Sequence, residues 1–379
     1  MQKKKRILLV YYKLFKPGGV AKVLTNLANS LSEEGYTVEI LLLMSKREHF
    51  YPLNPNIKVH NIDTFSHWAW KICEFNVKHL RFIPKIKNFN AYIYHIGVFL
   101  MLRNWMRKNH QNYDTIISAW YKLSKILSFF KFTRDKVYAW EHISHTVGGV
   151  FWGGILKRKY KDLRGVITTN KAGEFFYRKI NNNTITIYNM MDDYCEALEQ
   201  IKHEEKENII SVIARLDKEK NLIDFLDIIK MSKIPKSWKI KVMGEGSETK
   251  TLLNKRDAEE INVDFMGKGD INDVYNLLKK SKINCLTSIA EALPTILIQA
   301  MFHSNTLISY DCEHGPADII NEKNGFLVPV YNKEIFKQKL EYLTNNEDAL
   351  NNLMTTSFRE SKNWKKEKIL EKWIEILSH

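Results

Sequence analysis

Short runs of residues that favour β-strands alternate with helical stretches along most of the chain. In the first half, such runs lie at Ile7–Val10, Val38–Leu43, Thr115–Ser118, Val137–Trp140, Val166–Thr169 and Thr184–Ile187. The helical pattern lies between them, at Val20–Glu34, Tyr92–Lys108 and Lys171–Lys179. Strands that alternate with helices are typical of parallel sheets covered by helices on both faces, so the pattern predicts an α/β fold.

A polar stretch, Glu196–Asn208, interrupts this pattern and has little to bury, which favours a linker. A second series follows, with predicted strands at Ile209–Ala214, Ile240–Met243, Val263–Met266, Ile283–Leu286 and Thr306–Ser309. Predicted helices at Leu222–Met231, Ile271–Lys280 and Pro294–Phe302 separate these strands. We therefore predict two doubly wound parallel-sheet domains, residues 1–195 and 196–355, whose ligands bind beyond the carboxyl ends of the strands.

Length and composition agree with two globular domains. The chain has 379 residues, of which 44% are hydrophobic and 27% charged, and one core rarely keeps growing at that length. Basic residues precede the apolar run Ile7–Val10, but this run is too short for a signal peptide and fits a buried first strand. No apolar stretch is long enough to span a bilayer.

Cysteine spacing and net charge indicate the compartment and the partners of the protein. Cys73, Cys195, Cys285 and Cys312 are far apart and form no CxxC pair. This favours a reduced, cytoplasmic protein without a cysteine metal cage. The formal net charge of +15 favours anionic partners. Nucleic acid, an acidic membrane surface and phosphorylated ligands all fit, and charge does not choose between them.

Two loops carry residues suited to a phosphorylated ligand. Gly18 and Gly19 follow the first strand and open a helix, where glycine lets a backbone approach a ligand and the helix amides favour anions. A tight strand-to-helix turn explains the same pair. Arg215 ends a strand and Lys220 lies in the following loop. The planar guanidinium of Arg215 and the mobile ammonium of Lys220 suit a diphosphate. A solvated charge run has the same composition.

Three further strand ends contain candidate residues. Gly244 and Gly267 each follow a strand and permit a close turn, as many strand-to-helix junctions do. Glu291 precedes a predicted helix that contains Gln299, and Pro294 fits the first turn of that helix. This spacing lets Glu291 and Gln299 face one ligand. In the alternative, Glu291 is an acidic side chain that the dipole of the helix stabilises at the helix start.

With these residues in place, the sequence resembles the retaining glycosyltransferases of family 4, which have the GT-B fold of two Rossmann-like domains facing a cleft. Those enzymes carry two glutamates separated by seven residues, and the spacing of Glu291 and Gln299 matches them. The resemblance covers nearly the whole chain. Its other matches are Gly18-Gly19, Ile187-Tyr188-Asn189, Arg215-Leu216 with Lys220, Gly244-Glu245-Gly246, and Gly315-Pro316 with Asn324-Gly325.

The resemblance implies a role for each matched position. Arg215 and Lys220 would hold the donor diphosphate, Glu291 would meet hydroxyls of the transferred sugar, and Gln299 would bind the ribose. Backbone groups of the remaining donor-binding positions would surround sugar and phosphates, at Gly18, Gly19, Gly244, Gly267, Ala292, Leu293 and Pro294. Residues 356–379 would form a helical segment that crosses back to the first domain.

Two positions depart from the family pattern. Gln299 replaces the second glutamate and Ala292 replaces the commoner glycine. An amide can accept one ribose hydrogen bond and donate another, so donor use should survive, with nucleotide affinity in question.

The first domain offers a catalytic candidate and a candidate membrane surface. Related enzymes place a histidine near the donor sugar, and His142 follows its strand more closely than His145 does. The region Lys78–Lys108 mixes basic and aromatic residues, which suits an anionic bilayer interface. A core helix with a solvated basic edge is the alternative for this region.

We therefore predict a retaining, metal-independent enzyme without a cofactor, at the inner face of the cell membrane. It would move a hexose or N-acetylhexosamine from a nucleotide sugar, with UDP favoured, to a glycan or polyprenyl-diphosphate-linked acceptor for cell-envelope polysaccharide. A nucleotide-sugar epimerase of the same architecture is the first alternative. A nucleic-acid-binding protein is less favoured because no zinc-finger spacing, basic zipper or aromatic RNA-binding signature occurs, and no GxGxxG supports a dehydrogenase.

Overall fold

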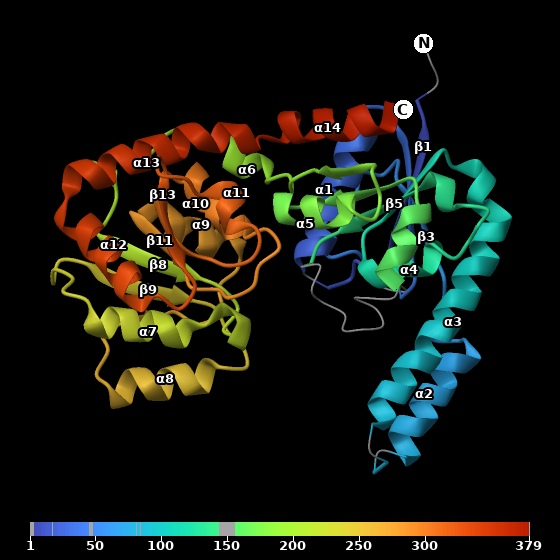
Figure 1. Ribbon diagram of the computed structural model, residues 1–379, viewed down its shortest axis with the longest axis horizontal. Helices are drawn as coiled ribbons and strands as arrows, with labels where there is room; N and C mark the ends of the chain where they lie inside the picture. The colour runs from blue at the N-terminus through green and yellow to red at the C-terminus, as the bar shows by residue number, and fades with distance from the viewer. Residues whose placement is uncertain are drawn as a thin grey trace. The chain divides into compact units, whose positions relative to one another are not determined.

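The computed structural model describes residues 4–16, 18–44, 48–80, 82–83, 85–143 and 156–378, apart from the side chain of Lys87. The chain divides into two compact units (Figure 1). Unit 1 comprises Met1–Thr168, Gly173–Ile187 and Leu370–His379, and unit 2 comprises Thr169–Ala172 and Tyr188–Ile369.

Unit 1 is built on a seven-stranded sheet with the order β3-β2-β1-β4-β5-β6-β7, and every strand pair is parallel. Its strands are β1 (Arg6–Tyr11), β2 (Thr37–Leu42), β3 (Lys58–Asn61), β4 (Thr115–Ser118), β5 (Val137–Glu141), β6 (Gly165–Thr168) and β7 (Thr184–Thr186). The strand order reverses direction between β1 and β4, which is where doubly wound sheets bind ligands.

Helices cover this sheet and close its core. They are α1 (Gly19–Glu33), α2 (Trp68–His79), α3 (Ile86–Asn109), α4 (Tyr121–Leu127) and α5 (Lys171–Arg178). The last part of α14 (Lys366–Ser378) also belongs to unit 1, where the ring of Trp373 lies 4.9 Å from that of Trp140. The central strands are apolar on both faces, as in β1, where Ile7–Val10 is fully buried.

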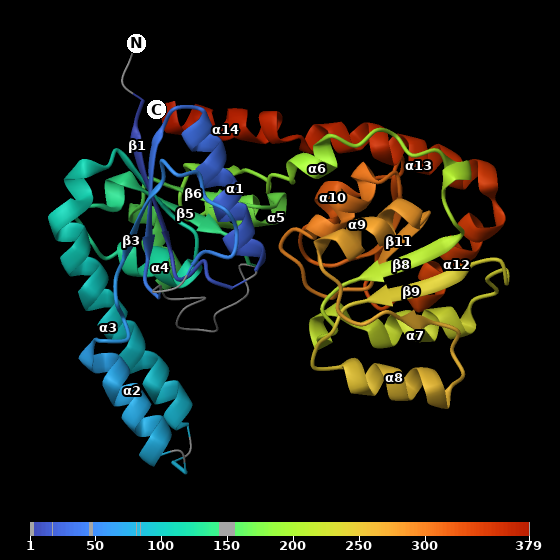
Figure 2. The same ribbon diagram turned by 180° about the vertical axis from the view of Figure 1, so that it is seen from behind.

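Unit 2 repeats the design with a six-stranded parallel sheet in the order β10-β9-β8-β11-β12-β13. Its strands are β8 (Ile209–Ile213), β9 (Lys239–Met243), β10 (Asp264–Phe265), β11 (Ile283–Leu286), β12 (Thr306–Asp311) and β13 (Gly325–Pro329). The strand order reverses direction between β8 and β11. Figure 2 shows β8 and β9 side by side with α7 and α8 below them.

The helices of unit 2 account for most of the second half of the chain. They are α6 (Asp193–Glu196), α7 (Leu222–Met231), α8 (Thr249–Ala258), α9 (Ile271–Lys280), α10 (Thr295–Phe302), α11 (Pro316–Ile319), α12 (Lys333–Asn345), α13 (Glu347–Ser361) and the first part of α14. The α/β prediction with two parallel sheets is confirmed. The edge strands β3 and β13, and the helices α2, α4, α8 and α12, are absent from the predicted set.

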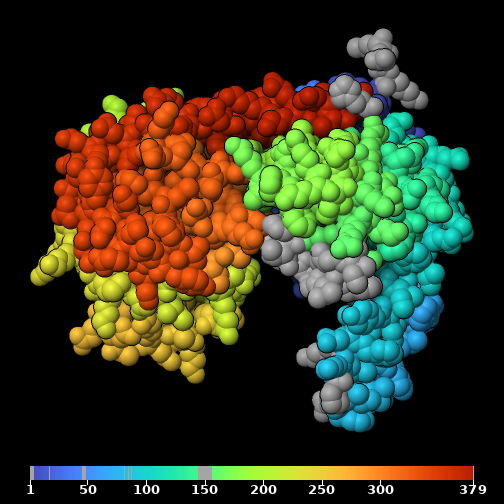
Figure 3. Space-filling view, in the orientation of Figure 1, coloured from blue at the N-terminus to red at the C-terminus, as the bar shows by residue number. Residues whose placement is uncertain are grey.

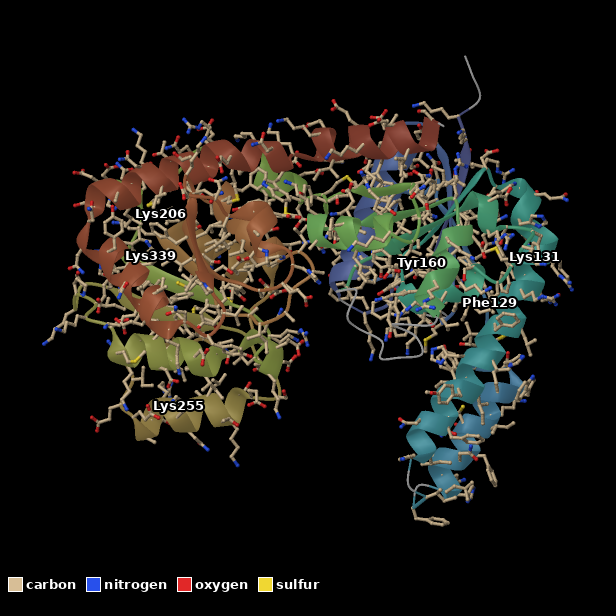
Figure 4. The ribbon with its side chains drawn as sticks, viewed as in Figure 1. Phe129, Lys131, Tyr160, Lys206, Lys255 and Lys339 are labelled. Carbon is tan, nitrogen blue, oxygen red and sulfur yellow. The ribbon has the colours of Figure 1, made fainter. Side chains whose placement is uncertain are left out.

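The polar stretch 196–208, which the sequence suggested as a linker, packs against unit 2. The ammonium group of Lys206 is buried, and it donates to the carbonyl oxygens of Leu278 and Ser281 at 3.1 and 2.5 Å (Figure 4). Those carbonyls lie at the end of α9, where the helix leaves its acceptors unpaired. The charge of Lys206 therefore serves as a helix cap, which composition alone does not reveal.

Candidate active site

The loops after β8, β9 and β11 in unit 2 carry most of the predicted donor-binding side chains. Arg215 lies two residues beyond β8, Gly244 follows β9 directly, and Glu291 lies between β11 and α10. Because parallel strands end at the same edge of a sheet, these loops are neighbours.

Arg215 is exposed and held by two carboxylates of its own loop. Its guanidinium forms an ion pair with Asp217 and donates to Glu219 Oε1 at 2.9 Å. Such exposed pairs contribute little to folding stability, because water competes for both charges. The pairs instead hold the planar donor fork of Arg215 at the strand end.

Asp217 joins the loop of Arg215 to the glycine loop after β9. Its Oδ1 atom accepts from the amide of Ser247 at 3.0 Å and from the hydroxyl of Ser247 at 3.2 Å. The bond from the Ser247 amide, together with the charge of Arg215, lowers the pKa of Asp217. Asp217 therefore stays ionised and connects both loops.

Lys220 and Glu291 form an ion pair at the same sheet edge. Lys220 Nζ donates to Glu291 Oε1 at 2.6 Å, and the two side chains are only 16% and 12% exposed. The loops that carry them are also joined by their backbones, because the Ile289 amide donates to the carbonyl of Glu219 at 2.9 Å. The structure thus brings together two residues for which the resemblance implied different contacts with the donor.

The start of α10 exposes unused backbone donors. The amides of Glu291, Ala292 and Leu293 donate no hydrogen bond to any residue that the structure describes. The side chain of Leu293 packs in the core and Pro294 precedes the first turn of α10. The backbone amides of residues 291–293 are thus available to an anionic ligand, whereas Pro294 has no N–H to donate.

A pocket of ≈ 900 Å³ lies against these loops within unit 2. Arg215 and Gln299 both line it, whereas Lys220 and Glu291 are not among the lining residues. The remaining lining residues come from the same strand ends and from α8, α9 and α10: Ile213, Ala214, Met243, Gly244, Glu245, Gly246, Thr249, Lys268, Gly269, Ile271, Val274 and Ile296.

Gly244 is required by the backbone geometry of this pocket. It has a positive φ of 147°, and a Cβ atom there would lie 1.8 Å from the carbonyl oxygen of Ala214. Its amide donates to the carbonyl of Gly267 at 2.8 Å. Gly244 therefore shapes the pocket wall through backbone packing, because no other residue fits at position 244.

Sequence reasoning missed Lys268, which lines the pocket, and Asp217, which holds Arg215 and Ser247 beside it. Lys268 adds a cation to the pocket wall directly after Gly267, and the Gly-Lys-Gly run that follows β10 was its only signal. Asp217 read as part of a charge run, because sequence spacing does not reveal its bond to Ser247.

His142 lies at the end of β5 in unit 1. Its ring packs 4.2 Å from that of Trp140, and its Nε2 atom has no hydrogen-bond partner among the described residues. Burial lowers the pKa of His142 to about 3. The imidazole is therefore neutral near pH 7 and suited to hydrogen bonding rather than to carrying charge. His145 lies outside the described residues.

Glu141 and its buried neighbours fix the strand end that carries His142. The carboxylate accepts from the hydroxyls of Tyr160 and Tyr177 at 2.6 and 3.1 Å (Figure 4). The buried ammonium groups of Lys125 and Lys157 interact electrostatically with Glu141, and burial lowers the pKa of Lys125 to about 8.

The Gly18-Gly19 pair opens α1 directly after the β1 loop. A Cβ atom at either glycine would meet no heavy atom within 4 Å. Packing among the described residues therefore does not demand glycine there, and a phosphate-binding role for the pair stays a prediction. Within the described part of the chain, no three His, Cys, Asp or Glu side chains are grouped to hold a metal ion.

Comparisons with known proteins place the chain among glycosyltransferases. Residues 195–359 match the family "Glycosyl transferases group 1". A Campylobacter jejuni protein, GalNAc-alpha-(1->4)-GalNAc-alpha-(1->3)-diNAcBac-PP-undecaprenol alpha-1,4-N-acetyl-D-galactosaminyltransferase, is 23% identical over 368 residues, 95% of each chain. The amylovoran biosynthesis glycosyltransferase AmsD of Erwinia amylovora is 23% identical over 384 residues, 98% of this chain and 99% of AmsD.

A solved structure extends the likeness to both units. The crystal structure of a Staphylococcus aureus TarM variant with UDP matches with a TM-score of 0.74 and 14% identity, over 99% of this chain and 100% of TarM. At this identity the match establishes the fold, which is the predicted GT-B type. The chain is thus a glycosyltransferase with the GT-B fold.

Proposed function

We propose that the enzyme transfers a hexose or N-acetylhexosamine from a UDP-sugar, by the retaining mechanism of family 4 and without a metal ion. The acceptor is a glycan or a polyprenyl-diphosphate-linked saccharide in cell-envelope polysaccharide synthesis. The observation that carries the proposal is the Lys220–Glu291 ion pair, 2.6 Å long and largely buried, in the strand-end loops after β8 and β11, the first of which also carries the pocket-lining Arg215.

The cations of this edge suit a leaving diphosphate. Arg215 offers a planar donor fork and Lys220 a point charge, while the free amides of residues 291–293 add neutral donors. Negative charge grows on the diphosphate oxygen as the sugar departs, so donors already in position stabilise the transition state more than the bound donor. Two cations also supply the charge that a divalent ion supplies in other transferases.

The transfer breaks one bond of the anomeric carbon and forms another. The bond between the anomeric carbon and the diphosphate oxygen breaks, and its electron pair stays on UDP. The acceptor hydroxyl attacks the same face of the sugar, forms the new glycosidic bond and passes its proton to the departing diphosphate. Glu291 accepts hydrogen bonds from sugar hydroxyls.

Donor binding has to exchange partners at both cations. Arg215 is paired with Asp217 and Glu219, and Lys220 is paired with Glu291. A diphosphate that approaches Lys220 replaces Glu291 as its ion-pair partner. The carboxylate of Glu291 can then accept hydrogen bonds from sugar hydroxyls. In this exchange Glu291 pairs with Lys220 before the donor binds and contacts the sugar afterwards.

The acceptor and the membrane surface follow from the relatives and from charge. The Campylobacter relative is named for a PP-undecaprenol-linked substrate and AmsD for a bacterial polysaccharide. Among the described residues no helix is both long and apolar enough to cross a bilayer. The net charge of +15 favours peripheral attachment to an anionic membrane surface.

Thermal stabilisation of the full chain by a panel of nucleotide sugars tests the donor proposal. UDP-hexoses or UDP-N-acetylhexosamines should raise Tm and be hydrolysed slowly, equally well in EDTA. Product analysis separates hydrolysis and transfer from epimerisation, and the anomeric configuration of the product tests retention. If no nucleotide sugar stabilises the protein, or if manganese is needed, the proposal is wrong.

A further inference from the structure

The helices α2 and α3 form a hairpin that extends away from the sheet of unit 1. Figures 1 and 2 show the two helices side by side, and the blue and cyan surface of the hairpin stands clear of the rest of unit 1 in Figure 3. Asn76 Nδ2 donates to Asn90 Oδ1 at 2.7 Å, and a Cβ atom on Gly97 would lie 2.6 Å from that of Ala69. Positions 76 and 90, then 69 and 97, are paired, so the helices are antiparallel.

Each helix leaves a row of large apolar side chains exposed. On α3 the row is Phe89, Tyr92, Ile96 and Leu100, which are 57%, 54%, 53% and 43% exposed. On α2 it is Trp68, Ile72 and Phe75, which are 47%, 40% and 57% exposed. Spacings of three and four residues place each row on one helix face. Isolated exposed apolar residues are ordinary, whereas a continuous row marks an interaction surface.

Helix geometry places both rows on the same side of the hairpin. At about 100° per residue, the α3 row lies about a quarter turn from Asn90 and Gly97, which face α2. The α2 row lies about a quarter turn, in the same rotational sense, from Ala69 and Asn76. Because the helices are antiparallel, equal rotations bring both rows to one side. The hairpin therefore presents a single apolar face two helices wide.

The segment of the chain that carries this face is rich in basic residues and has almost no acidic ones. Between Phe65 and Lys108 the sequence has Glu74 as its single acidic residue, against Lys71, Lys78, Arg81, Lys85, Lys87, Arg103, Arg107 and Lys108. Arg103 and Arg107 continue the α3 row at the same spacing, beyond Leu100. Within the described residues, neither forms an ion pair.

These charges decide which partner covers the apolar face. A second copy of the hairpin would bring two basic surfaces together, and like charges at an interface oppose association. An anionic bilayer offers apolar depth for the rings and phosphate for the basic side chains, whose long stems reach the headgroups.

Resting on the proposed membrane-linked acceptor, we infer that the α2–α3 hairpin lies flat in the interface of an anionic lipid bilayer and buries both apolar rows there. The central apolar segment of α3 has Lys85 before it and Arg103 after it, so both ends reach headgroups in a flat orientation. Entry by the tip would carry Lys78 and Lys85 into the hydrocarbon, which is costly. Interfacial helices of this kind bury their apolar face by roughly 5–10 Å.

Vesicle binding of the full chain tests the orientation. The row variant carries Phe89→Ser, Ile96→Ser and Leu100→Ser, whereas the tip variant carries Phe82→Ser and Ile83→Ser, whose parent side chains are 77% and 40% exposed. On phosphatidylglycerol-containing vesicles in high salt, the row variant should bind at least about tenfold more weakly than wild type, because apolar burial is not screened. The tip variant should lose less.

Phe175→Ser, which removes a ring 70% exposed on α5, is the matched control and should bind like wild type. Circular dichroism verifies that the row variant keeps its helices. Wild-type binding by the row variant, or a larger loss in the tip variant, overturns the inference. A dimer that dissociates in the row variant, without vesicle binding by wild type, assigns the face to a second copy. Hydrolysis of a UDP-sugar, measured in parallel, shows separately whether the donor proposal fails.

Discussion

Unit 2 keeps the cations of its strand ends in ion pairs, whereas the α2–α3 hairpin of unit 1 carries unpaired cations beside exposed apolar side chains. In unit 2, Lys220 is paired with Glu291 and Arg215 with two carboxylates. In the described part of the hairpin, none of the basic side chains has an acidic partner within 4 Å. Both units have parallel sheets covered by helices, so the fold does not cause this difference.

The difference shows two ways in which a basic protein meets anions. Paired cations are fixed in direction, and a small ligand has to replace a carboxylate of matching geometry, which gives selectivity. Unpaired cations on an extended hairpin act through a field that salt screens, and they suit a broad surface. The comparison predicts that donor chemistry and membrane attachment can be removed separately.

The largest effect should come from removing the paired cations. We expect Arg215→Ala and Lys220→Ala each to lower kcat for transfer by about 10²–10³-fold, as loss of a transition-state donor does. Vesicle binding should be unchanged. Lys218→Ala, an exposed lysine in the same turn, is the control and should keep full activity. Near-normal turnover in both variants would remove the diphosphate assignment.

Neutralising the hairpin is the converse change. Lys78, Lys85 and Arg107 are exposed, and each base near an anionic surface contributes about 1 kcal/mol. Replacing all three with Gln should weaken vesicle binding at low salt by tenfold or more and leave UDP-sugar hydrolysis unchanged. Co-sedimentation measures the first quantity and UDP release the second. Equal vesicle binding by variant and wild type would mean that the hairpin charge has no membrane role.

The neutral His142 adds a pH test within unit 1. Its pKa of about 3 in the folded protein lies below the ordinary value of about 6.5, so between these values the unfolded chain binds the extra proton. Stability from this group is therefore complete above about pH 6.5 and falls as the pH drops, by about 2 kcal/mol at pH 5. His142→Gln should lose less stability than wild type between pH 7 and 5 in urea unfolding. Identical losses would contradict the burial of the imidazole.

Asp217 should have a smaller, distinctive effect because it acts through Arg215. Asp217→Ala leaves the guanidinium of Arg215 with Glu219 as its one carboxylate partner and disconnects Ser247, so we expect KM for the donor to rise several-fold with kcat little changed. Asp217→Asn keeps an oxygen acceptor for the Ser247 amide and should recover part of the loss. A fall in kcat with unchanged KM would assign Asp217 a direct part in the reaction.

Gln299→Glu should have the smallest effect. It introduces the glutamate usual in the family 4 enzymes that the sequence resembles, and a carboxylate accepts both ribose hydroxyl protons, so donor binding should stay similar or tighten. Isothermal titration with UDP measures the change. Abolished activity in a folded variant would show that Gln299 has a role beyond the ribose.

The sequence by itself determined the two parallel sheets and most of the candidate site. Aliphatic runs such as Ile7–Val10 are buried on both faces, and this pattern needs no tertiary information. The glycines and charges that follow such runs lie at the carboxyl ends of strands, so position along the chain marked Arg215, Gly244 and Glu291 as candidates, and the family resemblance implied their roles.

Only the tertiary structure decided which charges have partners. The Lys220–Glu291 pair joins positions 71 residues apart, and Lys206 caps α9 at Leu278, 72 residues away. Composition treats both lysines and those of the hairpin alike, because the energy of a charge depends on burial and on neighbours that folding supplies. The sequence also did not reveal the apolar face of α2 and α3, because its two rows lie on one side only when the helices pack antiparallel.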